Sequence, residues 1–254
     1  MRIAMKNFRL IAVLLLLLAG CGDGSTGHPL KGDASDSATR KSACGRIGRL
    51  VLHLPSTDSF VGMTFDGNDH WVGGTRAPRG STCDDRLRQA SIALTWPEML
   101  PTGASPGLPR VGGKETIILT FVPYDPRVVR GQELQREAIQ SIDFSKPDAA
   151  WRLATEKKRI DPASGLHCME GRSSVADRDV CWNEGMGDGI STLVVCNRRS
   201  KEDPPLCRQV LLRPRDRVRT EVRYEGALRP QWRLIERRAG EFLEDHAISK
   251  SNGQ

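Results

Sequence analysis

The sequence has few aromatic residues and none of the short motifs that mark the common enzyme classes. Only 5% of its 254 residues are Phe, Trp or Tyr. It contains no GxSxG elbow, HExxH pair, P-loop or dinucleotide-binding glycine pattern. The five histidines are isolated along the chain, and the acidic pairs Asp84-Asp85 and Glu244-Asp245 suit a turn and a helix end better than a glycosidase couple. We therefore expect a protein that is not an enzyme and holds no cofactor.

The chain also lacks a hydrophobic run long enough to span a membrane. Its longest run, LIAVLLLLLAG at residues 10–20, follows three basic residues and has the length of a signal-peptide core. The run leads into Cys21, and this junction resembles the bacterial lipobox. The resemblance implies that residues 1–20 are removed and that Cys21 is lipidated. An ordinary secretory signal is the alternative. We expect the protein to lie in the bacterial envelope, facing the periplasm and anchored by lipid to the inner or the outer membrane.

Six further cysteines follow, and none of them forms a CxxC pair. An exported chain with an even number of cysteines favours up to three disulfides, although six cysteines allow fifteen pairings. The strand-like segments STLVV and RQVLL flank a polar turn, so we predict a hairpin disulfide between Cys196 and Cys207. Pairing of nearest remaining neighbours favours Cys168–Cys181 and Cys44–Cys83. A zinc site that uses His167 beside Cys168 is the competing hypothesis, and we expect no metal.

Arginine is concentrated near the end of the chain. The formal net charge of +7 falls to +4 once the three basic residues of the leader are removed, but ten arginines lie between positions 208 and 238. Such a cluster often binds nucleic acid. An envelope protein meets little nucleic acid, so the expected partner is an acidic protein or anionic lipid.

Within this cluster, a charged residue occupies every second position from Arg213 to Arg223. Successive side chains of a strand point to opposite faces, so a single strand would place all these charges on one face and Val218 and Val222 on the other. That basic face is either simply solvated or binds a partner. The candidate partner-binding residues are Arg213, Arg215, Arg217, Arg219 and Arg223.

Residues 21–42 are polar and small and read as a flexible tether that starts at Cys21. From Ala43 the chain is rich in β-strand patterns separated by glycine and proline. Helical spacing occurs at 131–144 and again at 229–246, where Trp232, Ile235, Ala239, Phe242 and Leu243 form one apolar stripe. The predicted class is α+β, with antiparallel sheets, a few covering helices and disulfide staples. Residues 43–250 form this globular region, as one large domain or as two small ones with a boundary near 145–165.

Two terminal segments carry a resemblance to a known family. They are SACGRIGRLVLHLP at the start of the globular region and EVRYEGALRPQWRLIERRAGEFLEDH at its end. Together with the lipobox they resemble the periplasmic immunity lipoproteins of type VI secretion systems, especially cognates of lipase effectors. The resemblance covers about forty residues. It implies a non-catalytic protein that binds and neutralises a secreted toxin, possibly a lipase. The alternative is a structural or accessory envelope lipoprotein that binds anionic lipid, peptidoglycan or an assembly partner.

Overall fold

The fold was determined as a computed structural model of the chain. The structure describes residues 43–54, 61–66, 72–73, 82–102, 110–111, 114–129, 132–142, 147–171, 177–185, 189–198 and 204–249. The leader, Cys21, the tether, His28 and His70 lie outside the described residues. Arg40–Gln254 form one compact unit.

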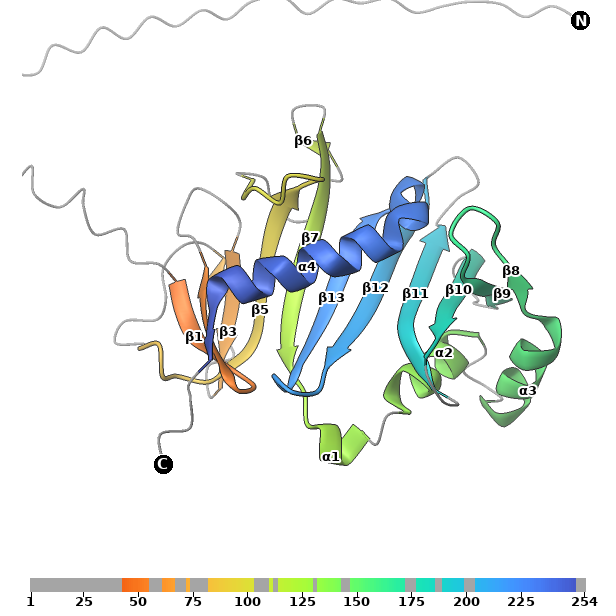
Figure 1. The fold of residues 1–254 in the computed structure, drawn as a ribbon, viewed down its shortest axis with the longest axis horizontal. Coiled ribbons are helices and arrows are strands. Elements are labelled where there is room, and N and C mark those ends of the chain that lie inside the picture. Colours follow the sequence, from red (N-terminus) through yellow and green to blue (C-terminus); the bar gives the residue numbers. More distant parts are fainter. Residues whose placement is uncertain are drawn as a thin grey trace, which may run out of the picture. The chain divides into compact units, whose positions relative to one another are not determined.

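Across the described residues, a sheet of eleven antiparallel strands makes up most of this unit (Figure 1). One half contains β3 (Val61–Phe65), β4 (Val72–Gly73), β5 (Leu87–Thr95), β6 (Arg110–Val111) and β7 (Lys114–Pro123). The other half contains β8 (Arg159–Ile160), β9 (His167–Gly171), β10 (Asp177–Glu184), β11 (Ile190–Arg198), β12 (Leu206–Arg213) and β13 (Val218–Glu225). The spatial order is β4-β3-β5-β7-β13-β12-β11-β10-β9-β8, with β6 beside β7.

The two halves of the sheet meet where β7 pairs with β13. In this register Val222 lies opposite Leu119, and Thr220 lies opposite Phe121. All four residues are buried. Because β13 comes about a hundred residues after β7, the centre of the sheet depends on a long-range pairing.

Helix α4 (Trp232–His246) crosses one face of this sheet (Figure 1). The predicted apolar stripe is the buried side of the helix, from Trp232 to Leu243. Its Phe242 ring stacks on Phe121 of β7 with 6.4 Å between centroids, and Trp232 Nε1 donates a hydrogen bond to the Ser164 carbonyl at 2.9 Å. Burial of each large side chain contributes roughly 1.5–3 kcal/mol, so the stripe fixes α4 on the sheet. The six-residue 3₁₀ helix η2 (Gly226–Gln231) leads into it.

The opposite face of the second half is covered by α2 (Glu133–Ile142) and α3 (Pro147–Lys157), which follow the short helix α1 (Pro126–Val129). Leu134, Ala138 and Ile142 of α2 pack in a second core cluster with Leu193 and Val195 of β11. Val194 and Cys196, which alternate with Leu193 and Val195 along β11, belong to the core cluster under α4 instead. β11 therefore has buried residues on both of its faces, as expected for a strand that is covered on both sides.

A second sheet of three strands, β1 (Ala43–Ile47), β2 (Leu50–Leu54) and β14 (Ala247–Ser249), forms beside the large one. β14 directly follows α4 and pairs with β2, so the two ends of the globular region lie together. The predicted class, α+β with antiparallel sheets, covering helices and disulfides, is confirmed. The described part of the chain contains no helix of the length and apolarity that a membrane span requires.

Candidate binding surface

The prediction that Arg213–Tyr224 form one strand with all its charges on one face is wrong. β12 ends at Arg213, residues 214–217 form a turn, and β13 begins at Val218. Pro214 has no backbone N–H and so cannot continue the ladder, and the Asp216 N–H donates to the Arg213 carbonyl at 3.2 Å to close the turn. The alternating charges therefore belong to a hairpin, and Arg213 faces the opposite side of the sheet from Arg219.

Arg213 lies on the α4 side and is held there by three acceptors. Its Nε is 2.9 Å from Asp216 Oδ2, one terminal nitrogen is 2.7 Å from Glu244 Oε1, and the other donates to the Gly240 carbonyl at 3.2 Å. These contacts tie the β12–β13 turn to α4. Arg213 is therefore a structural residue with its donors already occupied.

Arg219 lies on the α2 side in a denser set of ion pairs. Its guanidinium contacts Glu133 at 3.0 Å, Glu137 at 2.9 Å and Glu221 at 2.8 Å. Arg208 of β12 shares two of these carboxylates, at 2.5 Å from Glu137 and 3.5 Å from Glu221. Burial works against the charge of Arg219, but the three carboxylates outweigh it and raise its pKa. These ion pairs hold the start of α2 against the sheet and occupy the donor groups of Arg219.

The other arginines of the row differ from these two. Among the described residues, Arg215, Arg217 and Arg223 have no ion-pair partner, and Arg215 and Arg223 are exposed. Arg223 lies in register with Arg208 across the β12–β13 ladder. The row thus divides into two arginines held by ion pairs and three that have no ion pair among the described residues.

Arg217 opens into a cavity of about 500 Å³ at one end of the large sheet, which we call the basic pocket. Strand β1, the β1–β2 turn, the segment from β7 to α1 and the β12–β13 turn all contribute to it. Three arginines and two aspartates line it, together with Tyr124 and backbone of the turns; the lining residues are Arg46, Gly48, Asp66, Arg86, Leu87, Pro123, Tyr124, Asp125 and Arg217.

Backbone hydrogen bonds hold the walls of the basic pocket together. The Arg49 N–H donates to the Asp216 carbonyl and the Tyr124 N–H donates to the Arg217 carbonyl, each at 2.8 Å. Gly48 has a positive φ of 56°, and a Cβ there would overlap the carbonyl oxygens of the β12–β13 turn. Glycine is therefore required where the two turns touch. This contact fixes the position from which Arg217 extends.

Asp125 of the basic pocket is paired mainly with Arg127, and the nearby charge of Arg217 also lowers its pKa. Asp125 accepts hydrogen bonds from the Arg127 side chain at 3.0 and 3.2 Å, and these bonds lower the pKa of Asp125. Burial, with Glu133 and Asp125 adding to it, raises the pKa of Tyr124, so its hydroxyl stays neutral at physiological pH. Within the described residues, Arg46, Arg86 and Arg217 have no ion pair, and the three arginines of the lining exceed its two aspartates by one charge.

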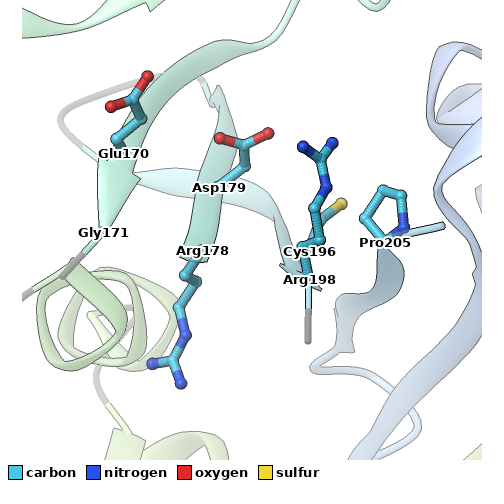
Figure 2. Close-up of a pocket in the computed structure, with 7 residues that line it drawn as sticks. All are labelled: Glu170, Gly171, Arg178, Asp179, Cys196, Arg198 and Pro205. Carbon is cyan, nitrogen blue, oxygen red and sulfur yellow. The ribbon is translucent and has the colours of Figure 1, made fainter. Parts of the chain in front are cut away.

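A smaller cavity of about 290 Å³ lies at β9, β10 and β11 (Figure 2). Figure 2 shows the carboxyl groups of Glu170 and Asp179 pointing to one side of the strands and Arg178 pointing to the other. Asp179 is 3.1 Å from Arg229, and Glu170 is 3.3 Å from Arg159. Its acids are therefore already paired, and this cavity is a weaker binding candidate than the basic pocket.

The structure joins the cysteines as Cys44–Cys83, Cys168–Cys181 and Cys196–Cys207. Cys196–Cys207, the hairpin disulfide, links directly opposed residues of β11 and β12. Cys168–Cys181 does the same across β9 and β10. The ligand atoms of Cys44, Cys83 and His53 lie within 4.8 Å of one another, but the two sulfur atoms are bonded to each other.

His167, the histidine of the zinc hypothesis, is 3.7 Å from a Glu184 carboxylate oxygen and lies beside the Trp182 ring. Its neighbour Cys168 is bonded to Cys181. The thiolate that this zinc site would need is therefore used in a disulfide.

Sequence reasoning identified Arg217 but missed the rest of the basic pocket. Arg46, Arg86 and Tyr124 come from three distant segments, and each is unremarkable in its own sequence surroundings. The one local signal was Gly48, which follows a β-rich segment and permits the tight turn that reaches the pocket.

Comparisons with known proteins give one informative result. No protein-family model matches the chain, and no curated protein matches its sequence significantly. A solved structure with a similar fold is that of an immunity protein of the Stenotrophomonas maltophilia type IV secretion system. The TM-score is 0.50 at 12% sequence identity, and the match covers 82% of this chain and 93% of that one. This likeness establishes a shared fold across most of both chains.

Proposed function

We propose that this protein is an immunity protein that binds and neutralises a toxic effector delivered by a secretion system. The observation that carries the proposal is the fold shared with a secretion-system immunity protein over nearly the whole of that chain. The resemblance of the terminal segments to immunity lipoproteins supports the same class independently. In this role the protein acts by stoichiometric binding and has no catalytic residues of its own.

The proposed location follows from the first forty residues. Residues 1–20 serve as a lipoprotein signal, Cys21 carries lipid, and residues up to 42 connect it to the globular region from 43 to 250. A lipid anchor in the inner or outer membrane would keep the protein in the periplasm at high local concentration. A toxin that attacks the envelope, such as a lipase, would meet its inhibitor there.

Two delivery systems fit the proposal. The terminal segments resemble immunity proteins of type VI systems, whereas the fold neighbour serves a type IV system. The delivery system is therefore identified by experiment, with attacker strains in which one system at a time is inactive.

The experiment that tests the function is a competition between siblings. A strain without this gene should grow normally alone and should be killed beside toxin-armed siblings, and the full-length gene should restore its survival. A Cys21→Ser variant, which cannot be lipidated, should protect less well. If the deletion strain instead shows an envelope defect in monoculture and survives beside armed siblings, the protein is an accessory envelope lipoprotein.

A capture experiment identifies the partner. The full-length protein is extracted in mild detergent under oxidising conditions and used to retain proteins from an extract in which the strain's effectors are expressed. We expect retention of one exported toxin in a one-to-one complex. If only peptidoglycan or lipid is retained although the effectors are present in the extract, the immunity proposal is wrong.

A further inference from the structure

We propose that the basic pocket is the receptor for carboxylate side chains on an acidic segment of a protein partner. This inference rests on the proposed function for the identity of the partner, which would be the toxin.

Arg46, Arg86 and Arg217 converge on the basic pocket, and none of them has an ion pair among the described residues. Arg46 and Arg86 form an isolated parallel bridge, so their backbones lie side by side, and both residues line the pocket together with Arg217. By contrast, Arg213 and Arg219 each contact carboxylates. Among the described residues these three guanidinium groups share the lining with two aspartates, so the cavity has an excess positive charge that an added anion would reduce. Their convergence therefore indicates an anionic ligand.

The backbone of Arg217 has a left-handed φ of 56°. In this left-handed region a residue with a Cβ is destabilised by about 1 kcal/mol or more, and glycine would remove that strain. The turn nevertheless has an arginine there, held by the hydrogen bond from Tyr124 N–H to its carbonyl. Backbone strain of this kind is concentrated at ligand sites. The side chain of Arg217 is thus the feature that explains the position.

A carboxylate suits the basic pocket better than a phosphate or a lipid headgroup does. Arginine forms paired hydrogen bonds with carboxylates, and the neutral Tyr124 can donate one more from the wall of the pocket. Asp66 and Asp125 also line the cavity, and they repel a doubly charged phosphate more than a singly charged carboxylate. A recessed site with aspartates in its wall is also a poor surface for a flat layer of lipid headgroups. These features favour protein carboxylates over a membrane.

The test compares two variants that each lose three positive charges. The pocket variant is Arg46→Gln with Arg86→Gln and Arg217→Asn, because asparagine tolerates a positive φ. The surface variant is Arg152→Gln with Arg198→Gln and Arg223→Gln, three exposed arginines without ion pairs among the described residues. Both full-length proteins are compared with the parent for thermal unfolding. If the pocket variant unfolds early, Arg86→Gln alone replaces it, since Arg86 is exposed and its removal leaves the turns intact.

The probes are a fluorescent hexaglutamate peptide, inorganic phosphate and vesicles that contain phosphatidylglycerol. Peptide binding should be weakened at least tenfold in the pocket variant and less than threefold in the surface variant, and equimolar phosphate should not displace the peptide. Equal peptide affinity in both variants would overturn the proposal. Loss of vesicle binding with unchanged peptide binding would assign the pocket to the membrane instead.

The toxin-capture experiment separates this inference from the proposed function. If the pocket variant loses the toxin while the surface variant retains it, both stand. If both variants retain the toxin, the immunity function stands and the pocket is not its receptor. If even the parent protein retains no toxin, the immunity function fails, and the peptide measurement alone decides the chemistry of the pocket.

Discussion

Removal of the Arg219 charge should be among the most damaging single changes on the surface of the sheet. In an Arg219→Met variant, Glu133, Glu137 and Glu221 lose the cation that joins them, and only Arg208 remains to compensate two of the three. The Arg219, Glu137 and Glu221 side chains are each only 15% exposed, so water replaces the lost contacts poorly. Breaking a fully buried ion pair costs about 3–5 kcal/mol. The partial exposure and the remaining arginine reduce this to about 2–3 kcal/mol.

The measurement is urea unfolding of the oxidised protein at pH 7. With a slope of roughly 2–3 kcal/mol per molar urea, the midpoint should fall by about 1 M. The matched control is Arg223→Met, on the same strand and face, whose side chain is exposed and unpaired within the described residues. Its effect should stay within about 0.5 kcal/mol, since surface changes away from specific contacts are small.

A double-mutant cycle checks the mechanism. Glu137→Gln combined with Arg219→Met should cost less than the sum of the two single changes, with a coupling of about 1–2 kcal/mol. Two results would refute the argument. One is an Arg219→Met variant as stable as the Arg223→Met control, and the other is strict additivity with Glu137→Gln.

Three other changes have defined expectations. Burial raises the pKa of Glu236 despite a hydrogen bond from Thr192, so above that pKa the buried negative charge destabilises the folded state. Glu236→Gln should therefore be more stable than the parent at pH 7. This gain in stability should vanish below about pH 4 in pH-dependent unfolding curves. Gly48→Ala should destabilise the protein by about 2 kcal/mol or more, because the new Cβ overlaps the Asp216 carbonyl. Gly165 also has a positive φ but faces open space, so Gly165→Ala should cost only about 1 kcal/mol in the same urea assay. Replacing both cysteines of the hairpin disulfide by serine should cost about 3 kcal/mol, and a loss below 1 kcal/mol would contradict the chain-entropy estimate.

Local patterns predicted the elements whose burial depends on local spacing. The stripe from Trp232 to Leu243 predicted α4 and its buried side, because helical periodicity alone decides which residues share a face. Helix α2 was predicted for the same reason. Helix α3 was missed, since the apolar residues of Pro147–Lys157 have weaker helical spacing, and its Trp151 ring packs on Trp182, which is distant in sequence.

The arginine row shows where such reasoning fails. Alternation from Arg213 to Arg223 is equally compatible with one strand and with a hairpin whose turn reverses the faces, and Pro214 was the residue that should have decided between them. Which arginines are free depends on acids from α2 and α4, which no spacing within the row can reveal. The basic pocket is harder still to predict from sequence, because its three arginines are brought together only by tertiary contacts between distant segments.

The pairing of β7 with β13 has a consequence for how the chain reaches its final form. Any process that delivers the chain from its N-terminus, whether synthesis or passage across a membrane, releases β7 long before β13 is available. Until then both halves of the sheet end in an open strand edge, and α4 is still absent from the core it covers. Contacts so distant in sequence form slowly. In a chain built in this order, the join between the two halves of the sheet and the cover that α4 provides can form only after the last forty residues or so have arrived.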